Sequence, residues 1–169
     1  MKIGIINVSD RASQGVYEDI PGKRTKELLQ ETINEDVTFE YAVVPDEVEE
    51  ISKSMIAMAD EKKCNLIIST GGTGPAPRDV TPEATEKVIE KALPGFGEAM
   101  RMESLAKVPT SILSRQVAGI RGSSLIVNLP GKPKAIGECL EIIMPAVPYC
   151  VQLIGGPKIT LELSALKQS

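Results

Sequence analysis

The sequence contains no histidine and no tryptophan, and it has only three tyrosines and two phenylalanines among its 169 residues. The missing histidine excludes Ser-His-Asp and Cys-His catalytic arrangements, and it excludes a histidine general base near neutral pH. Carboxylates, lysines, hydroxyls, backbone donors and a bound metal ion remain as catalytic groups. The low aromatic share of 3% means that Ile, Leu, Val, Ala and Met must build the core.

Cysteine is scarce as well, and the three cysteines form no Cys-x-x-Cys pair. Without histidine, a zinc site would need ligands scattered along the chain. An odd number of cysteines without a pattern is typical of a reducing cytosol rather than of a disulfide framework. We therefore expect a cytoplasmic protein.

Long hydrophobic runs and an excess of positive charge are absent too. No stretch approaches the roughly 18 consecutive apolar residues that span a bilayer, and a strand-like run at residues 2–8 begins with no signal peptide ahead of it. Lys and Arg total 19 against 23 Asp and Glu, a formal charge of −4. A nucleic-acid-binding protein would be expected to have a basic face and more aromatic residues for stacking. The sequence therefore predicts a soluble protein that binds neither membranes nor nucleic acids.

Apolar periodicity predicts strands and helices in alternation. Strands are expected at residues 3–8, 37–44, 66–69, 117–120 and 124–129, with a short edge strand at 159–163. Helices are expected at residues 22–33, 48–59, 81–92, 96–106 and 136–151.

Two details refine this pattern. Proline cannot donate a helix hydrogen bond, so Pro145 and Pro148 are expected to kink the last helix. The strands at 117–120 and 124–129 flank a tight turn and predict a small β-hairpin. With 169 residues, the chain is long enough for one domain and short for two. We therefore expect one domain over residues 1–169: a Rossmann-like, three-layer α/β/α sandwich with a mostly parallel sheet.

The segment Thr-Gly-Gly-Thr-Gly at residues 70–74 is the most informative stretch of the chain. Its three glycines leave backbone N–H groups free to close on a phosphate. Thr81 as N-cap and Pro82 in the first turn would then open a helix whose N-terminus carries partial positive charge. A tight turn alone needs fewer glycines, and the sequence matches neither a P-loop nor Gly-x-Gly-x-x-Gly. The segment indicates a site for an anionic ligand.

Three further loops follow predicted strands and are rich in small, polar or charged residues. They cover residues 9–13, 45–47 and 128–131. In open α/β sheets, ligands bind beyond the carboxyl ends of the strands. We therefore expect these loops and the glycine loop to converge on one rim of the sheet.

Asp46 and Asp79 are the carboxylates in these loops that could hold a metal ion. Each has a structural alternative: Asp46 fits a capping box with Glu49 at the third helical position, and Asp79 fits an Asx turn ahead of Thr81. A carboxylate beside bound phosphate is repelled unless a divalent cation bridges the two. Both aspartates in one phosphate site would therefore imply Mg²⁺.

Other polar residues in these loops also have two interpretations. Arg78 lies between the glycine loop and the next helix, where it could grip a phosphate. By position alone, Ser114 and Arg115 would be an ordinary loop pair ahead of the hairpin. Asp10 also fits a simple turn residue.

Four motifs in this order resemble the molybdopterin adenylyltransferase family, of the MogA/MoaB type, to which the first domain of gephyrin is related. They are Thr-Gly-Gly-Thr-Gly at 70–74, Arg-Asp-Val-Thr-Pro-Glu-Ala at 78–84, Val-Pro-Asp at 44–46 and Asn-Leu-Pro-Gly at 128–131. The segments 8–13 and 131–140 resemble the bacterial MogA branch in particular. The resemblance extends over essentially the whole chain.

The resemblance implies Mg²⁺-dependent transfer of AMP from ATP to the terminal phosphate of molybdopterin, with release of pyrophosphate. It implies that Asp46 and Asp79 are catalytic and hold the metal ion. Expected substrate-binding residues are Thr70, Gly71, Gly72, Thr73, Gly74, Arg78, Ser114 and Arg115. Expected nucleotide-binding residues are Ser9, Asp10, Asn128, Pro130 and Gly131. A homotrimer is also implied, as is hand-over of the product to a downstream molybdenum-insertion protein.

Two other functions fit the same motifs. A pterin-binding module or scaffold of this fold would hold molybdopterin without transferring AMP. The related competence-damage-inducible proteins act on other nucleotide-like substrates, but the short single domain and the MogA-like ends argue against that group. Turnover distinguishes the transferase from the scaffold, and binding does not.

Overall fold

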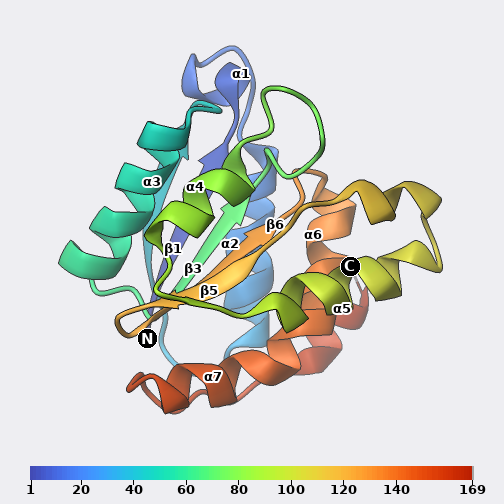
Figure 1. Ribbon diagram of the computed structural model, residues 1–169. Helices are drawn as coiled ribbons and strands as arrows, with labels where there is room; N and C mark the ends of the chain where they lie inside the picture. The colour runs from blue at the N-terminus through green and yellow to red at the C-terminus, as the bar shows by residue number, and fades with distance from the viewer. Residues whose placement is uncertain (169) are drawn as a thin grey trace.

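The computed structural model describes residues 1–168 and contains one mixed six-stranded sheet with helices on both faces (Figure 1). The strand order is β2-β1-β3-β6-β5-β4. Four neighbouring strands are parallel: β2 (Thr38–Val44), β1 (Lys2–Val8), β3 (Leu66–Thr70) and β6 (Ser124–Leu129). β5 (Ala118–Arg121) pairs antiparallel with β6, and the edge strand β4 (Lys91–Ala92) pairs antiparallel with β5. The predicted sandwich, mostly parallel sheet and β5–β6 hairpin are confirmed.

Alternation along the central strands divides the core into two layers. Leu66 and Ile68 face one layer, and Ile67 between them faces the other. The first layer is covered by α2 (Ile20–Thr32), α5 (Pro94–Leu105), α6 (Pro133–Ile143) and α7 (Val147–Leu153). The second layer is covered by α3 (Val48–Ile56) and α4 (Thr81–Val88). Strands buried on both faces explain why the sequence reads as apolar runs there.

The predicted helix at 81–92 is too long. In the structure α4 ends at Val88, because Ile89 is extended and Lys91–Ala92 forms β4. β4 pairs antiparallel with β5, opposite Gly119 and Ile120. This non-local pairing overrides the helical pattern of the segment.

The predicted interruption of the last helix at Pro145 is confirmed: the 3₁₀ turn η3 (Met144–Ala146), which contains Pro145, separates α6 from α7. Pro148 lies in the first turn of α7 and does not interrupt it. The edge strand expected at 159–163 is wrong: the segment makes only an isolated bridge between Ile33 and Leu161 and then enters the 3₁₀ helix η4 (Leu163–Gln168). Its apolar residues pack on the helical layer instead of extending the sheet.

The predicted helix at 48–59 corresponds to α3 and the π-helical turn η1 (Ala57–Glu61) that prolongs it. Two short helical segments, α1 (Asp10–Ser13) and the 3₁₀ helix η2 (Pro109–Leu113), are not predicted by the sequence pattern. They have only four and five residues, too few for a 3.6-residue period to repeat.

The stretch Pro133–Leu153, which includes α6 and α7, is long and apolar enough by composition to cross a bilayer. The core helix of a soluble protein passes the same test. Ile136, Leu140 and Val147 are fully buried against the sheet, which is the environment of such a core helix.

The hairpin is tied to the second helical layer by Arg121. Its guanidinium donates to the Asp60 carboxylate at 2.6 Å and to the Val88 carbonyl at 3.0 Å. The hydrogen bonds from Arg121 lower the pKa of Asp60 below its ordinary value of 3.8. A carboxyl whose pKa is depressed by folding stabilises the protein above its unfolded pKa and loses that contribution as the pH falls.

We predict that Asp60→Asn lowers the melting temperature modestly at neutral pH. The difference from the wild type should shrink as the pH falls below the ordinary carboxyl pKa of 3.8 and through the lower pKa of the native carboxyl. Scanning calorimetry between pH 3 and pH 7 measures this. A difference in melting temperature that stays constant from pH 3 to pH 7 would contradict the stabilising role of the Asp60–Arg121 ion pair.

Candidate functional site

The carboxyl ends of the parallel strands meet at one rim of the sheet, at the top of Figure 1. Direct backbone bonds join the loops that leave it. Ser9 N donates to Val44 O at 2.9 Å, and Gly71 N donates to Leu129 O at 3.1 Å. The predicted convergence of the four loops is therefore confirmed.

The glycine loop approaches its neighbours too closely for side chains at two positions. Gly71 and Gly72 have φ angles of 94° and 62°, which L-residues rarely adopt. A Cβ at Gly71 would lie 2.4 Å from the carbonyl oxygen of Val8. A Cβ at Gly72 would lie 2.5 Å from Thr81 Oγ1 and 2.9 Å from Asp46 Oδ1. The bare loop thus brings β1, α4 and Asp46 together.

Thr81 holds this loop rather than capping α4 as predicted. The N-cap is Val80, and Thr81 is the first helical residue. Thr81 Oγ1 donates to Gly71 O at 2.8 Å, and Thr81 N donates to Gly72 O at 3.0 Å. These two hydrogen bonds hold the glycine loop against the first turn of α4.

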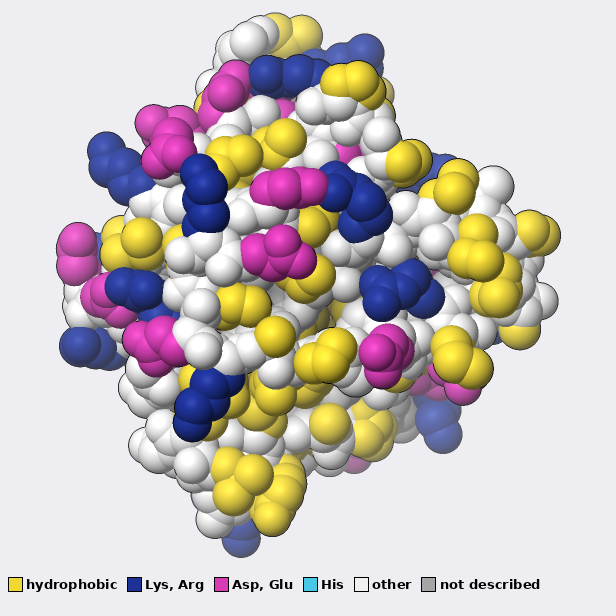
Figure 2. All heavy atoms as spheres, viewed as in Figure 1, with side chains coloured by type: hydrophobic (Ala, Val, Ile, Leu, Met, Phe, Trp, Pro, Cys, Tyr) yellow, Lys and Arg dark blue, Asp and Glu magenta, His cyan; other side chains and the backbone are white. Residues whose placement is uncertain are grey.

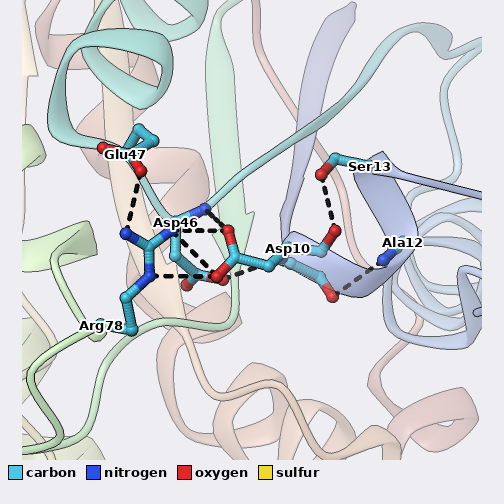
Figure 3. Close-up of polar contacts among 7 residues, drawn as sticks. Asp10, Ala12, Ser13, Asp46, Glu47 and Arg78 are labelled. Atoms are coloured by element: carbon cyan, nitrogen blue, oxygen red, sulfur yellow. Dashed lines mark hydrogen bonds and ion pairs between the residues drawn. The ribbon is translucent and has the colours of Figure 1, made fainter. Parts of the chain in front are cut away.

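Asp46 is paired with Asp10 through two reciprocal hydrogen bonds (Figure 3). Asp46 N donates to Asp10 Oδ1 at 3.0 Å, and Asp10 N donates to Asp46 Oδ2 at 3.0 Å. The N-cap of α3 is Glu47, which makes no side-chain cap bond. The capping-box alternative for Asp46 is therefore wrong, because its carboxylate binds the loop after β1.

Arg78 is engaged by carboxylates on both sides (Figure 3). Its Nη2 donates to Asp10 Oδ1 at 2.8 Å, and its Nη1 donates to Glu47 Oε1 at 2.9 Å. The hydrogen bonds from Arg78 lower the pKa of Asp10. Arg78 lies at the rim, as predicted, but a phosphate would have to compete with two carboxylates for it.

Asp79 lies at the other end of the glycine loop. Its Oδ2 accepts a hydrogen bond at 3.0 Å from the backbone N–H of Ala76, three residues earlier in the chain. The side chain therefore does not form the predicted Asx turn toward Thr81. A Cβ at Gly74 would lie 2.8 Å from Asp79 Oδ2.

Burial raises the pKa of Asp46, and the nearby charges of Asp10 and Asp79 raise it further. The hydrogen bond from Asp10 N and the charge of Arg78 oppose that shift. The rim thus concentrates negative charge that a cation would relieve.

The carboxylate oxygens at this rim suit Mg²⁺, a hard cation that prefers oxygen ligands and keeps several bound waters. Asp46 Oδ1 faces Gly72, and Asp79 lies close enough to Asp46 to influence its ionisation. Within residues 1–168 no group of three or more His, Cys, Asp or Glu side chains could hold a metal ion. Mg²⁺ is commonly bound by one or two carboxylates together with substrate phosphates, and Asp46 and Asp79 could supply them here.

Ser114 and Arg115 are more than an ordinary loop pair. Arg115 contacts the glycine loop through its backbone N–H, which donates to Thr73 O at 2.8 Å, and through its guanidinium. Ser114 Oγ donates to Gln116 Oε1 at 2.6 Å. Gln116 is buried and has no counterpart among the predicted residues, since no motif in the sequence marks it.

The side chains of Thr70 and Asn128 are fully buried beneath the rim. Thr70 Oγ1 donates to Asn7 Oδ1 at 3.3 Å. Asn128 Nδ2 donates to Ser69 Oγ at 2.9 Å and to Thr85 Oγ1 at 2.8 Å. Both side chains lie beneath the loops of the rim and make their hydrogen bonds to other buried side chains.

Two cavities open beside the glycine loop. The larger cleft, of about 580 Å³, is lined by residues that include Gly74, Ser114, Gln116, Gly131 and three lysines, Lys107, Lys132 and Lys134. The smaller cavity, of about 270 Å³, is lined by residues that include Ser9, Tyr17, Gly71 and Gly131. Gly131 lines both, so the two cavities adjoin. Three of the predicted substrate residues, Thr73, Gly74 and Ser114, line the larger cleft. Gly71 and Ser9 line the smaller cavity.

Cys139 also lines the larger cleft. Burial raises the pKa of its thiol to about 11. The thiol therefore stays protonated at neutral pH and is a poor nucleophile.

Comparison with known proteins agrees with this geometry. Residues 4–149 match the family described as "Probable molybdopterin binding domain". A Helicobacter pylori (strain 26695) protein named molybdopterin adenylyltransferase is 62% identical over 154 residues, which cover 91% of this chain and 88% of that protein. The Escherichia coli K12 protein of the same name is 46% identical over 171 residues, covering 94% and 88%.

A solved structure shows the same fold. The molybdopterin biosynthesis enzyme MoaB from Thermus thermophilus superimposes with a TM-score of 0.85 at 41% sequence identity, covering 93% of this chain and 98% of that one. The family match spans most of the chain, from β1 to α7. The chain therefore belongs to the molybdopterin-binding domain family, together with the adenylyltransferases to which it is similar.

Proposed function

We propose that this protein is a molybdopterin adenylyltransferase of molybdenum cofactor biosynthesis, with the chain acting as one molybdopterin- and nucleotide-binding domain. It transfers AMP from ATP to the terminal phosphate of molybdopterin. The observation that carries this proposal is the placement of Asp46 and Asp79 against a glycine loop whose residues line two cavities. The names of relatives that are 46–62% identical support the same activity.

The absence of histidine suits this reaction. An oxygen of the molybdopterin phosphate attacks the α-phosphorus of ATP, and the bond from that phosphorus to the bridging oxygen breaks. Pyrophosphate leaves with the bonding electron pair. A phosphate monoester has a second pKa near 6, so the nucleophile is largely deprotonated at neutral pH and needs no general base. The enzyme must align two anionic substrates and stabilise the leaving group.

Each cavity suits one substrate. We assign molybdopterin to the larger cleft, where Lys107, Lys132 and Lys134 supply positive charge and Ser114 supplies a hydroxyl. We assign the nucleotide to the smaller cavity, lined by Ser9, Tyr17 and Gly131. The glycine loop lies beside both, so the phosphates of the two substrates would meet above it.

Asp46 and Asp79 are the residues that would hold Mg²⁺. When bound, the ion would neutralise phosphate charge and favour departure of pyrophosphate. Asp10 fixes the backbone and one oxygen of Asp46 and leaves Oδ1 directed toward the glycine loop. Arg78 balances part of the negative charge of this cluster through Asp10.

We also propose a homotrimer located in the cytoplasm, whose product passes to a downstream molybdenum-insertion protein. Exposed hydrophobic side chains gather on the lobe formed by the end of α5 and η2, on the right of Figure 2. They are Met102, Leu105, Val108, Ile112 and Leu113. Contiguous apolar patches on a soluble protein are typical of protein interfaces.

Substitution of the aspartates tests the catalytic assignment. We predict that Asp46→Asn and Asp79→Asn each lower turnover by about 100-fold or more, because a neutral amide binds Mg²⁺ poorly. Pyrophosphate release and mass spectrometry of the adenylylated pterin measure this, with circular dichroism to confirm folding. Near-normal turnover in both variants would contradict the role.

Substitution of Gly72 tests whether the close approach of the glycine loop to Asp46 and Thr81 matters for turnover. We predict that Gly72→Ala lowers turnover by roughly 10- to 100-fold, because the new Cβ displaces Asp46 and Thr81. Gly122 is the matched control: its φ is 53°, and a Cβ there meets no atom within 4 Å. Gly122→Ala has a similar backbone strain of about 1–2 kcal/mol and should leave turnover unchanged. Equal activity in the two variants would show that crowding at Gly72 is unimportant.

The assembly is tested by sedimentation. We predict a species of three times the 18.1 kDa chain mass at micromolar concentration. Ile112→Asp and Leu113→Asp should shift it toward monomer, because a charge would be buried at the interface. A wild-type monomer at all concentrations would refute the trimer.

A further inference from the structure

We propose that Arg115 is a positioning residue that holds Asp79 in place by tying together the two ends of loop 74–79, and that it is not a ligand of substrate phosphate. The inference rests on the proposed function only in that Asp79 is taken to act in catalysis. It assigns to Arg115 a role different from the substrate binding that the family resemblance implies.

The guanidinium of Arg115 bridges two main-chain carbonyls that are five residues apart. Its Nε donates to Gly74 O at 2.8 Å, and its Nη2 donates to Asp79 O at 2.6 Å. The backbone N–H of the same residue donates to Thr73 O at 2.8 Å. One residue thus fixes the beginning and the end of the loop.

Glu83, in the first turn of α4, orients this bridge. Its carboxylate pairs with Nη1 of Arg115 and accepts from Nη2 at 3.3 Å. Together with the two carbonyls, these bonds occupy four of the five N–H donors of an arginine. The charge is balanced and most donors are engaged, which leaves little capacity for a phosphate.

Inside the loop, the carboxylate of Asp79 depends on the closed turn. Asp79 N donates to Ala76 O at 2.9 Å, and Ala76 N donates back to Asp79 Oδ2 at 3.0 Å. The loop contains no helix or strand, and Pro75 and Pro77 have no N–H to donate. The bonds from Arg115 therefore set where the Asp79 side chain lies.

Lysine in place of Arg115 would keep the charge and lose the bridge. An ammonium group is a point donor and lacks the planar fork that reaches two carbonyls and a carboxylate at once. Arg121 offers a matched control in the same chain. Its guanidinium also joins a carboxylate, Asp60, to a main-chain carbonyl, Val88 O, but it belongs to the hairpin, outside the cavities assigned to the substrates.

The test compares Arg115→Lys with Arg121→Lys. In Arg115→Lys we expect the amides of Ala76 and Asp79 to exchange with deuterium about tenfold faster or more. We expect kcat to fall roughly 10- to 100-fold, with the KM for molybdopterin changed by less than about threefold. In Arg121→Lys we expect loop exchange and kcat to match the wild type. If Arg115→Lys does not fold, Glu83→Gln should show the same changes to a smaller degree.

Two results would overturn the inference. One is unchanged exchange in loop 74–79 of Arg115→Lys. The other is a rise in KM with near-normal kcat, which is the behaviour of a residue that binds substrate phosphate directly. If the wild type itself forms no adenylylated pterin, the proposed function fails, and the exchange measurement alone then decides the role of Arg115.

Discussion

The close approach of a bare backbone to its neighbours at Gly71 and Gly72 is the constraint on which the candidate site depends. Because no Cβ is present there, the loop after β3 reaches the carbonyl of Val8 and the side chains of Asp46 and Thr81. Thr81 then fixes the start of α4 to the loop. The two glycines thus allow the loop after β3 to contact β1, Asp46 and α4, which are distant from one another in the sequence.

Around this contact, each candidate catalytic aspartate is held by bonds to main-chain groups. Asp46 is held by the reciprocal pair with Asp10, and Asp79 by the turn that Arg115 closes. Charged partners on the outside, Arg78 and Glu83, complete each arrangement. Such preorganisation suits a reaction in which positioning and charge stabilisation do most of the catalysis.

The sequence allowed the parts with a local cause to be predicted. Buried parallel strands read as apolar runs, and the loops at their carboxyl ends had to share a rim, so the sheet and the meeting of the glycine loop with Asp46 followed. What could not be predicted depends on non-local partners. β4 ends the helical segment by pairing with β5, Asp46 bonds to Asp10 instead of capping α3, and Arg115 binds carbonyls across the loop. No short-range pattern distinguishes a guanidinium that will bind a phosphate from one that will bind a backbone.

The most direct test of the account is incubation of the wild-type protein with molybdopterin and ATP, with and without Mg²⁺, followed by mass spectrometry of the pterin and measurement of pyrophosphate. The account predicts adenylylated molybdopterin and an equal amount of pyrophosphate, both dependent on Mg²⁺. Tight binding of molybdopterin with no product, under conditions in which a related adenylyltransferase turns over, would contradict it and identify the protein as a pterin-binding scaffold.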